Sequence, residues 1–250
     1  MGFWKDVSDL IKAVDIVVEV VDARMPELSR NREVEKLVRK NRKELVKAFN
    51  KIDLVSKGSL EELRDKYKGD FLVSVRTGEG MKGLRSKLRT LAKEKGFEKI
   101  GFVGYPNAGK SALINFLTRR GKAKVSSKAG TTRGIQWINF DDLKILDSPG
   151  VIPNNEWNEV KLALLNAKNV NKLKDPRKVA IGIIDIFLKD NPEALRERYG
   201  LEENIIKKES WDIFEMIGEK MRVFKKKGEV DENRVAFMIV NDWQKGRLKL

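Results

Sequence analysis

Two patterns in the sequence predict an α/β protein, in which a doubly wound, mostly parallel sheet is followed by a small all-helical domain. Up to about residue 154, short apolar runs rich in β-branched residues alternate with segments of helical periodicity. From residue 155 onward only helical periodicity continues. We therefore expect two domains, 1–154 and 155–250, each large enough to fold around its own core.

The strands expected in the first domain are apolar runs, and helical segments separate most of them. Residues 15–21 are mostly β-branched, which suits a strand buried on both faces of a parallel sheet. The expected strands are 15–21, 45–49, 71–73, 100–103, 135–140 and 143–146, and the expected helices are 31–41, 59–67, 80–95 and 110–118. A tight turn at Asp141-Asp142 should join the last two strands. Ligands of such sheets bind outside the C-terminal strand ends.

The second domain is expected to contain helices alone. They should cover 158–168, 176–189, 192–199, 205–222 and 231–245. In the last of these, Asp231 lies in a capping region, and apolar residues from Val235 to Trp243 form one face.

The charge of the chain points to a polyanionic partner. The formal net charge is +15, from 52 Lys and Arg against 37 Asp and Glu. Residues 1–154 hold 32 basic and 20 acidic residues, whereas residues 155–250 hold 20 and 17, so the excess is +12 in the first part and +3 in the second. RNA is the partner that this balance favours. A merely solubilising surface is the alternative.

Composition also excludes several classes of protein. The chain has no cysteine and no histidine, so disulfides, thiolate metal sites and a histidine general base are excluded. No apolar run is long enough to span a membrane, and residues 1–6 lack a secretory pattern. We expect a cytoplasmic protein that does not contact membranes.

A phosphate-binding loop is the most specific motif. Residues 104–111 read G-Y-P-N-A-G-K-S, which fits the pattern G-x-x-x-x-G-K-S. An apolar strand at 100–103 leads into the loop and a helix leads out of it, as the pattern requires. Backbone N–H groups of such a loop close round a phosphate chain, and the helix N-terminus adds partial positive charge.

The residues of this loop have distinct expected roles. Lys110 should reach the β- and γ-phosphates, and the Ser111 hydroxyl should bind Mg²⁺. The phosphate contacts are expected from Asn107, Ala108, Gly109, Lys110, Ser111 and Ala112.

A guanine-reading motif lies upstream of this loop. Residues 50–53 read N-K-I-D at the end of the strand at 45–49, and fit N-K-x-D. The Asp53 carboxylate can accept from both N1–H and the N2 amine of guanine, a donor pair that adenine lacks. Asn50 can bond the base or tie loops together, and the Lys51 stem can lie over the ring. Ser74-Val75, one strand later, should place a backbone N–H at guanine O6.

The order of the two motifs is the reverse of that in common GTPases. A later candidate, 171–175, reads N-K-L-K-D, which is one residue too long and follows no convincing strand. The upstream motif is therefore preferred, which makes the domain circularly permuted. A permutation is physically reasonable, since the termini of compact domains often lie close together.

At this level the chain resembles the circularly permuted GTPases of the YlqF/RbgA type, which act in assembly of the large ribosomal subunit. The resemblance rests on residues 22–26 (D-A-R-M-P), 50–53, 104–111, 130–133 (G-T-T-R) and 147–150 (D-S-P-G), and on the helical second part. It implies a GTPase domain plus an RNA-associated helical domain. It also implies GTP or GDP as ligand, Mg²⁺, and the large subunit with its rRNA as partner, but neither DNA nor a membrane.

The resemblance further implies two switch segments. Thr132, with Thr131 as the alternative, should complete the Mg²⁺ shell when a γ-phosphate is present. Asp147 should hold Mg²⁺ through water, and the N–H of Gly150 should sense the γ-phosphate.

The sequence lacks the residue that commonly positions the attacking water. The residue after Gly150 is Val151, where many GTPases have a water-orienting Gln, and no histidine can replace it. Asn107 is instead a candidate ligand for K⁺, which would neutralise charge in the transition state. Catalytic roles are thus expected for Lys110, Thr132, Gly150 and Asn107, and hydrolysis should be slow without a partner.

The positive charge falls into clusters that we expect to contact RNA. These are 30–47, 82–95, 119–128 and the smaller 225–227. Two other functions stay open: a GTPase that serves another RNA such as tRNA, and a nucleotide-sensing RNA scaffold with negligible turnover.

Overall fold

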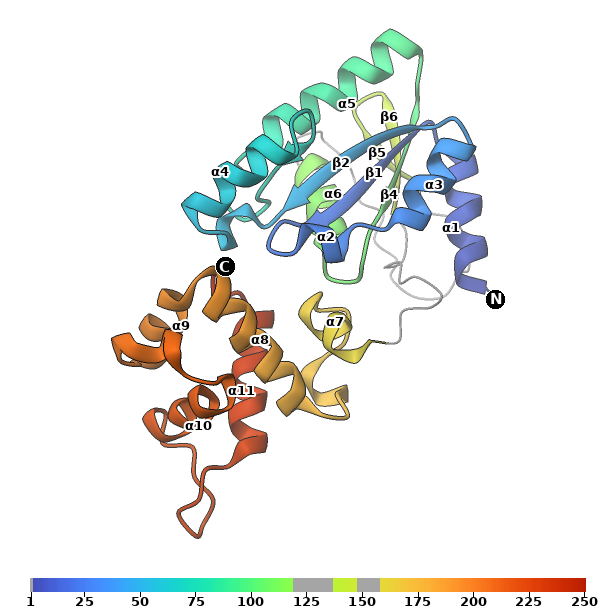
Figure 1. Ribbon diagram of the computed structural model, residues 1–250. Helices are drawn as coiled ribbons and strands as arrows, with labels where there is room; N and C mark the ends of the chain where they lie inside the picture. Colours follow the sequence, from blue (N-terminus) through green and yellow to red (C-terminus); the bar gives the residue numbers. More distant parts are fainter. Residues whose placement is uncertain (1, 119–136, 148–157) are drawn as a thin grey trace. The chain divides into compact units, whose positions relative to one another are not determined.

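The computed structural model describes residues 2–118, 137–147 and 158–250, and the chain forms two compact units (Figure 1). The first unit comprises Met1–Asp53 and Leu60–Asn155, and the second comprises Leu54–Ser59 and Glu156–Leu250.

The first unit is built on a six-stranded sheet. The strands are β1 Ile16–Asp22, β2 Glu44–Asn50, β3 Phe71–Leu72, β4 Lys99–Val103, β5 Trp137–Phe140 and β6 Leu143–Asp147, in the order β3-β2-β1-β4-β6-β5. All neighbours pair in parallel except β5 and β6, which form an antiparallel hairpin. This confirms the mostly parallel sheet that the sequence predicts.

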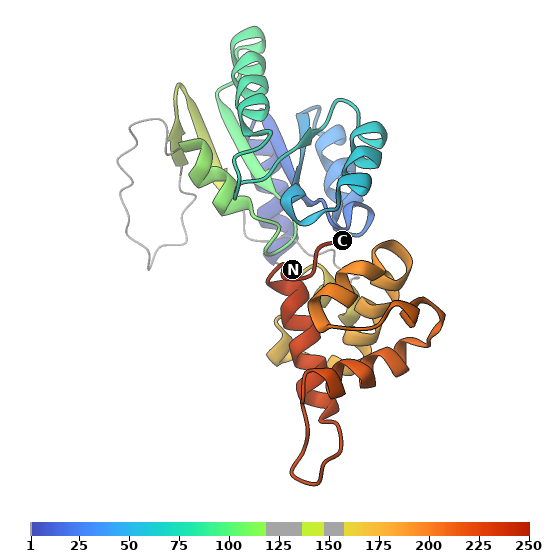
Figure 2. The same cartoon turned by 90° about the vertical axis from the view of Figure 1, so that its left-hand side faces the viewer.

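Helices cover both faces of this sheet (Figures 1 and 2). The helices of this part of the chain are α1 Gly2–Ala13, α2 Pro26–Ser29, α3 Arg32–Lys40, α4 Lys57–Lys66, α5 Met81–Lys95 and α6 Lys110–Thr118, with the short 3-10 turn η1 Ile52–Leu54. The end of η1 and the start of α4 belong to the second unit. Alternate residues of β1 face opposite sides: Val18 packs in the cluster that α5 and α6 complete, and Val17 in the one that α1 and α3 complete. The doubly wound architecture follows from this alternation.

Helix α1 was not among the expected elements. Its buried residues Val7, Leu10 and Ile11, followed by Val14, recur at helical spacing and pack against β1, β4 and β6. The structure therefore adds a helix where the sequence analysis begins only with the strand at residue 15.

In the described part of the second unit the regular elements are helices, and one isolated antiparallel β-bridge joins Phe224 and Val230. Its helices are α7 Glu159–Leu164, α8 Pro176–Asp190, α9 Pro192–Tyr199, α10 Ser210–Lys220 and α11 Glu232–Gln244, with 3-10 turns η2 Val170–Lys172 and η3 Glu203–Lys207. The single helix expected over 205–222 is wrong. Lys208 and Glu209 are extended, with ψ angles of 153° and 147°, and divide this segment into η3 and α10.

Helix α11 is the centre of the second unit. Its Trp243 is buried, meets the Phe187 ring of α8 edge-to-face at 5.8 Å, and donates its indole N–H to the Leu164 carbonyl at 2.8 Å. The cap predicted at Asp231 is confirmed, because its carboxylate accepts from the Arg234 N–H at 3.2 Å.

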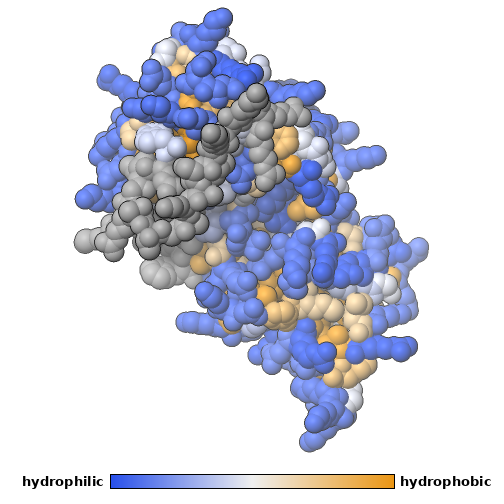
Figure 3. Space-filling model, turned by 180° about the vertical axis from the view of Figure 1, so that it is seen from behind, coloured by the Kyte–Doolittle hydropathy of each residue, from blue (hydrophilic) through white to orange (hydrophobic). Residues whose placement is uncertain are grey.

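The hydropathy of the surface agrees with the high content of charged residues in the first part of the sequence. Figure 3 shows a largely hydrophilic face over the first unit and a concentration of hydrophobic residues over the second. Among the described residues, no helix is both long enough and apolar enough to cross a membrane.

Candidate nucleotide-binding site

The strand order brings the sequence motifs to one edge of the sheet. Strand β3 leads towards Ser74, β2 into Lys51, β1 into Ala23 and β4 into Gly104. Because these four strands are parallel neighbours, the four segments leave the sheet at its C-terminal edge. Motifs that are far apart in the sequence thus lie at the same edge of the sheet. A circular permutation changes their order along the chain but not this arrangement in space.

The two glycines of the phosphate-binding loop are required by close packing. A Cβ atom on Gly104 would lie 2.4 Å from the Val20 carbonyl oxygen, and a Cβ on Gly109 would lie 2.2 Å from Nδ2 of Asn50. Gly109 also has a φ of +102°, which side chains disfavour. The loop is therefore pressed against the ends of both β1 and β2.

Lys110 is the first residue of α6 and lies within the loop. Its side chain is buried, and Nζ donates to the carbonyl oxygens of Gly104 and Tyr105, both at 3.2 Å. The next residue, Ser111, is exposed at the helix N-terminus. The ammonium and the aligned N–H groups of the first turn make this loop an anion-binding arrangement.

Asn50 ties the guanine-reading segment to the phosphate-binding loop. Its Nδ2 donates to the Ala108 carbonyl at 2.9 Å, and its Oδ1 accepts from the Val75 N–H at 3.3 Å. Of the two roles open to Asn50 from sequence, the structure shows the joining of loops. Since the Val75 N–H is directed to Asn50, its donation to guanine O6 stays a prediction.

The Asp53 carboxylate is held by two side chains. Oδ1 accepts from the Ser74 hydroxyl at 2.6 Å, and Oδ2 forms an ion pair with Nε of Arg76 at 2.8 Å. Ser74 is fully buried and also accepts from the Thr77 N–H, so its hydroxyl has a fixed orientation. The contact of Arg76 was not anticipated from the sequence.

A buried ionic cluster joins the segment after β1 to the guanine-reading segment. The Asp22 carboxylate binds the Arg24 guanidinium at 2.8 Å and Nζ of Lys51 at 2.7 Å. Burial alone would raise the pKa of Asp22, but the charges of Arg24 and Lys51 outweigh it and hold the pKa well below its usual range. The ion pair with Asp22 fixes the side chain of Lys51 in place. The backbone of Lys51 has a φ of +71°.

The sequence offered one signal for this cluster. Asp22 immediately precedes the turn at the C-terminal end of β1, where a polar residue is expected to serve the site. Its partners could not be named without the strand order, which places Asp22 directly opposite Asn50 in β2.

The expected Mg²⁺ ligands are partly described. Asp147 is the last residue of β6 and pairs with Phe102 of β4, so it ends beside the strand that leads into the phosphate-binding loop. Serine and aspartate are residue types with oxygen donors, the ligands that Mg²⁺ prefers, and coordination of the ion by Ser111 and Asp147 stays a prediction. Thr131, Thr132, Gly150, Val151 and the basic segment 119–128 lie outside the described residues.

The fold and the motifs at its edge define a P-loop GTPase domain whose base-reading motif precedes its phosphate-binding loop. The model of the RsgA GTPase family matches residues 5–155, and the model described as 50S ribosome-binding GTPase matches residues 99–228. The chain therefore belongs to the circularly permuted GTPases of the YlqF/RbgA type.

Individual relatives agree with this family. An uncharacterised GTP-binding protein of Methanocaldococcus jannaschii is 35% identical over 248 residues, which cover 98% of this chain but 65% of that protein. Ribosome biogenesis GTPase A of Priestia megaterium is 30% identical over 259 residues, covering 95% and 88%. A GDP-bound YlqF structure superposes with a TM-score of 0.63 at 26% identity, covering 97% and 95%.

Proposed function

We propose that the protein binds and hydrolyses GTP and acts as a cytoplasmic switch in assembly of the large ribosomal subunit. The chemical step is attack of water on the γ-phosphate. Support comes from the site geometry and from its relative in Priestia megaterium, a ribosome biogenesis GTPase.

The observation that carries this proposal is the link between the two nucleotide motifs. Asn50 holds the loop carbonyl of Ala108, while Asp53, three residues later, has its carboxylate oriented by Ser74. A carboxylate fixed at this place can accept both N1–H and N2–H of guanine, and the phosphates of the same nucleotide would reach the N–H groups of α6. The arrangement selects guanine over adenine by hydrogen bonding.

Residues 107–112, which include Lys110, would bind the phosphates. Ser111, Asp147 and Thr132 would hold Mg²⁺, which neutralises charge that develops on the phosphate oxygens. Because the amine of Lys110 lies within reach of the loop carbonyls Gly104 and Tyr105, it would exchange these for phosphate oxygens when nucleotide binds. The Gly150 N–H would bond the γ-phosphate.

Turnover would depend on more than these groups. Val151 cannot orient water, so stabilisation of the transition state falls to other charges. Asn107 is exposed in the phosphate-binding loop, with a φ of +60°, and would contribute to a K⁺ site. We infer that hydrolysis is slow in isolation and faster on the particle.

The RNA contact would use cations that are not already paired. On α5, Arg85 and Arg89 both bind Asp141, and Lys95 binds Glu44. In the described part of the chain, the exposed cations that form no ion pair include Lys36, Arg39 and Lys40 on α3 and Lys82, Lys87 and Lys93 on α5. These six are better candidates for phosphate contacts than their paired neighbours.

The test combines binding and turnover. We expect the protein to co-sediment with large ribosomal subunits more strongly with a non-hydrolysable GTP analogue than with GDP, and to hydrolyse GTP faster when subunits are present. Binding should weaken steeply with salt, because neutralised phosphates release counterions. Equal binding with both nucleotides and without any, or stimulation by tRNA but not by subunits, would contradict the proposal.

A further inference from the structure

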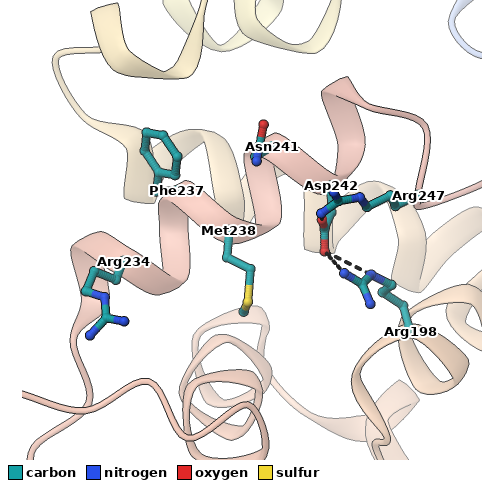
Figure 4. Close-up of a pocket in the computed structure, with 7 residues that line it drawn as sticks. All are labelled: Arg198, Arg234, Phe237, Met238, Asn241, Asp242 and Arg247. Carbon is teal, nitrogen blue, oxygen red and sulfur yellow. Dashed lines mark hydrogen bonds and ion pairs between the residues drawn. The ribbon is translucent and has the colours of Figure 1, made fainter.

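A cavity lined by both polar and apolar side chains lies within the helical unit. It has a volume of about 370 Å³ and follows one face of α11, with Arg198 of α9 and Arg247 at one end (Figure 4). Phe237 and Asn241 lie along one side of this face, and Arg234 and Met238 along the other. The volume suits a ligand of a few rings rather than a single ion.

A buried carboxylate fixes two of the arginines. Asp242 is 1% exposed, and its Oδ2 accepts from Arg198 at 2.8 Å while its Oδ1 accepts from Arg247 at 2.9 Å. The side chain of Arg247 is half exposed, at 53%, and its guanidinium uses one of its five N–H donors in this pair. Asp242 thus orders a guanidinium that still presents donors to solvent, which lowers the entropy lost when an anion binds.

The cavity has an excess of positive charge at both ends. Three arginines face a single aspartate, which leaves a formal charge of +2. Arg234 is eight residues from Asp242 along α11, a rise of about 12 Å, so the cation at one end is well separated from the pair at the other. The side chains of Arg234 and Asn241 form no hydrogen bond or ion pair with any other described residue.

An exposed aromatic ring lies between these charges. Phe237 is 38% exposed although it belongs to the central helix of the unit, and Asn241 follows one helical turn later on the same side. A phenyl face can stack a nucleobase, and a side-chain amide can both donate to and accept from a base edge.

We propose that this cavity binds an unpaired nucleotide of single-stranded RNA. The base stacks on Phe237, its edge bonds the Asn241 amide, and the phosphates on either side contact Arg234 and Arg247. A duplex does not fit this chemistry, because its bases are stacked on one another and are not free to cover the ring. An acidic peptide would use the arginines but would leave the phenyl face and the amide without partners.

This inference rests on the proposed function, since it assigns part of the RNA partner to the helical unit. It is tested with the full chain and a fluorescent single-stranded RNA of mixed sequence, followed by anisotropy. Phe237→Ala should weaken binding about fivefold or more, because stacking of one base is lost. Arg234→Gln should weaken binding and reduce the salt slope by about one ion.

Matched controls separate the cavity from general charge effects. Phe224→Ala removes an equally exposed ring of the same unit, and Arg222→Gln removes an exposed cation. Both should bind the RNA as the parent does, and Phe237→Ala should leave duplex binding unchanged. Unchanged melting temperatures show that the variants are folded.

Three results would overturn the assignment. The first is an equal loss of RNA affinity in Phe224→Ala and Phe237→Ala. The second is tighter binding of duplex RNA than of single-stranded RNA by the parent protein. The third is displacement of the RNA by oligoglutamate as effectively as by unlabelled RNA, which would identify an acidic-peptide site. The proposed function fails separately. If the oligonucleotide binds in the cavity but the protein does not bind ribosomal subunits, the assignment of the cavity is supported and the proposed ribosomal role is contradicted.

Discussion

The side-chain amide of Asn50 donates to the carbonyl oxygen of Ala108 at 2.9 Å, and this bond joins two segments that lie 58 residues apart in the chain. The same amide explains why Gly109 has no side chain, since a Cβ there would lie 2.2 Å from Nδ2. One residue of the guanine-reading motif therefore shapes the loop that is proposed to hold the phosphates. This hydrogen bond thus connects the base-reading end of the proposed nucleotide site to its phosphate-binding end.

The first prediction concerns this link. Asn50→Ala leaves the Ala108 carbonyl and the Val75 N–H without their side-chain partner, at a cost of about 1–3 kcal/mol. We expect GDP and GTP affinities to fall together, roughly tenfold, as measured by titration calorimetry. An exposed amide of the helical unit, Asn233, provides the control variant Asn233→Ala. If nucleotide affinity is the same in Asn50→Ala and in the parent, the link has no role in binding.

The second prediction concerns the buried cluster around Asp22. Asp22→Ala removes the buried carboxylate that binds the Arg24 guanidinium and Nζ of Lys51, and we expect the free energy of unfolding to fall by about 3–5 kcal/mol in urea titrations. Asp65→Ala removes a carboxylate that is 81% exposed and should change stability by less than about 1 kcal/mol. Similar losses in the two variants would mean that the cluster does not stabilise the fold. A folded Asp22→Ala should also bind GTP less tightly, because Lys51 is no longer held.

The third prediction concerns pH. Burial raises the pKa of Glu19 in β1 from 4.5 to about 7, although its carboxylate accepts from the Asn31 N–H at 2.7 Å. Between these two values the folded state binds more protons than the unfolded state, so this residue makes stability fall as pH rises through the window and level off above it. Glu19→Gln cannot ionise and should not show this loss.

The measurement compares unfolding free energies at roughly pH 5 and pH 8, either side of the shifted value. Relative to the parent, Glu19→Gln should gain stability at the higher pH, by on the order of 3 kcal/mol at most. Glu33→Gln, on the exposed side of α3, is the control and should follow the parent. A parallel pH dependence in parent and Glu19→Gln would show that Glu19 is ionised throughout.

The sheet was predictable because each strand is a local signal. Apolar β-branched runs such as residues 16–21, and a tight turn at Asp141 with a φ of +52°, can be recognised without knowing their neighbours. The phosphate-binding loop could be recognised from the sequence for the same reason, because its pattern is local. By contrast, the division of residues 205–222 at Lys208 could not be foreseen, because apolar residues occur on both sides of the break.

Contacts across the site were not predictable, since they depend on strand order. The pairing of Asp22 with Lys51 exists because β1 and β2 are neighbours with Asp22 opposite Asn50. The contact between Arg76 and Asp53 likewise requires β3 to lie beside β2. Helix α1 differs, because its apolar spacing was present in the sequence but without an acidic first turn to mark where it begins.

The fourth prediction concerns the monovalent cation. If Asn107 contributes to a K⁺ site, steady-state GTP hydrolysis should be faster in KCl than in NaCl at equal ionic strength, and Asn107→Ala should remove most of that difference. The left-handed backbone of residue 107 makes Asn107→Gly the better second variant, because it keeps the loop geometry while deleting the amide. Equal rates of the parent in both salts would eliminate the K⁺ site.

The central claim is that the guanine base is read by the upstream motif, and Asp53→Asn tests it most directly. The asparagine amide would face guanine N1–H and N2–H with a donor, whereas xanthine offers an acceptor at O2. The variant should therefore lose GTP affinity by roughly tenfold or more and bind XTP better than the parent does. The measurement is the ratio of GTP to XTP dissociation constants for parent and variant. A reversal of preference is the result that the account predicts, and an unchanged ratio with full GTP affinity would contradict it.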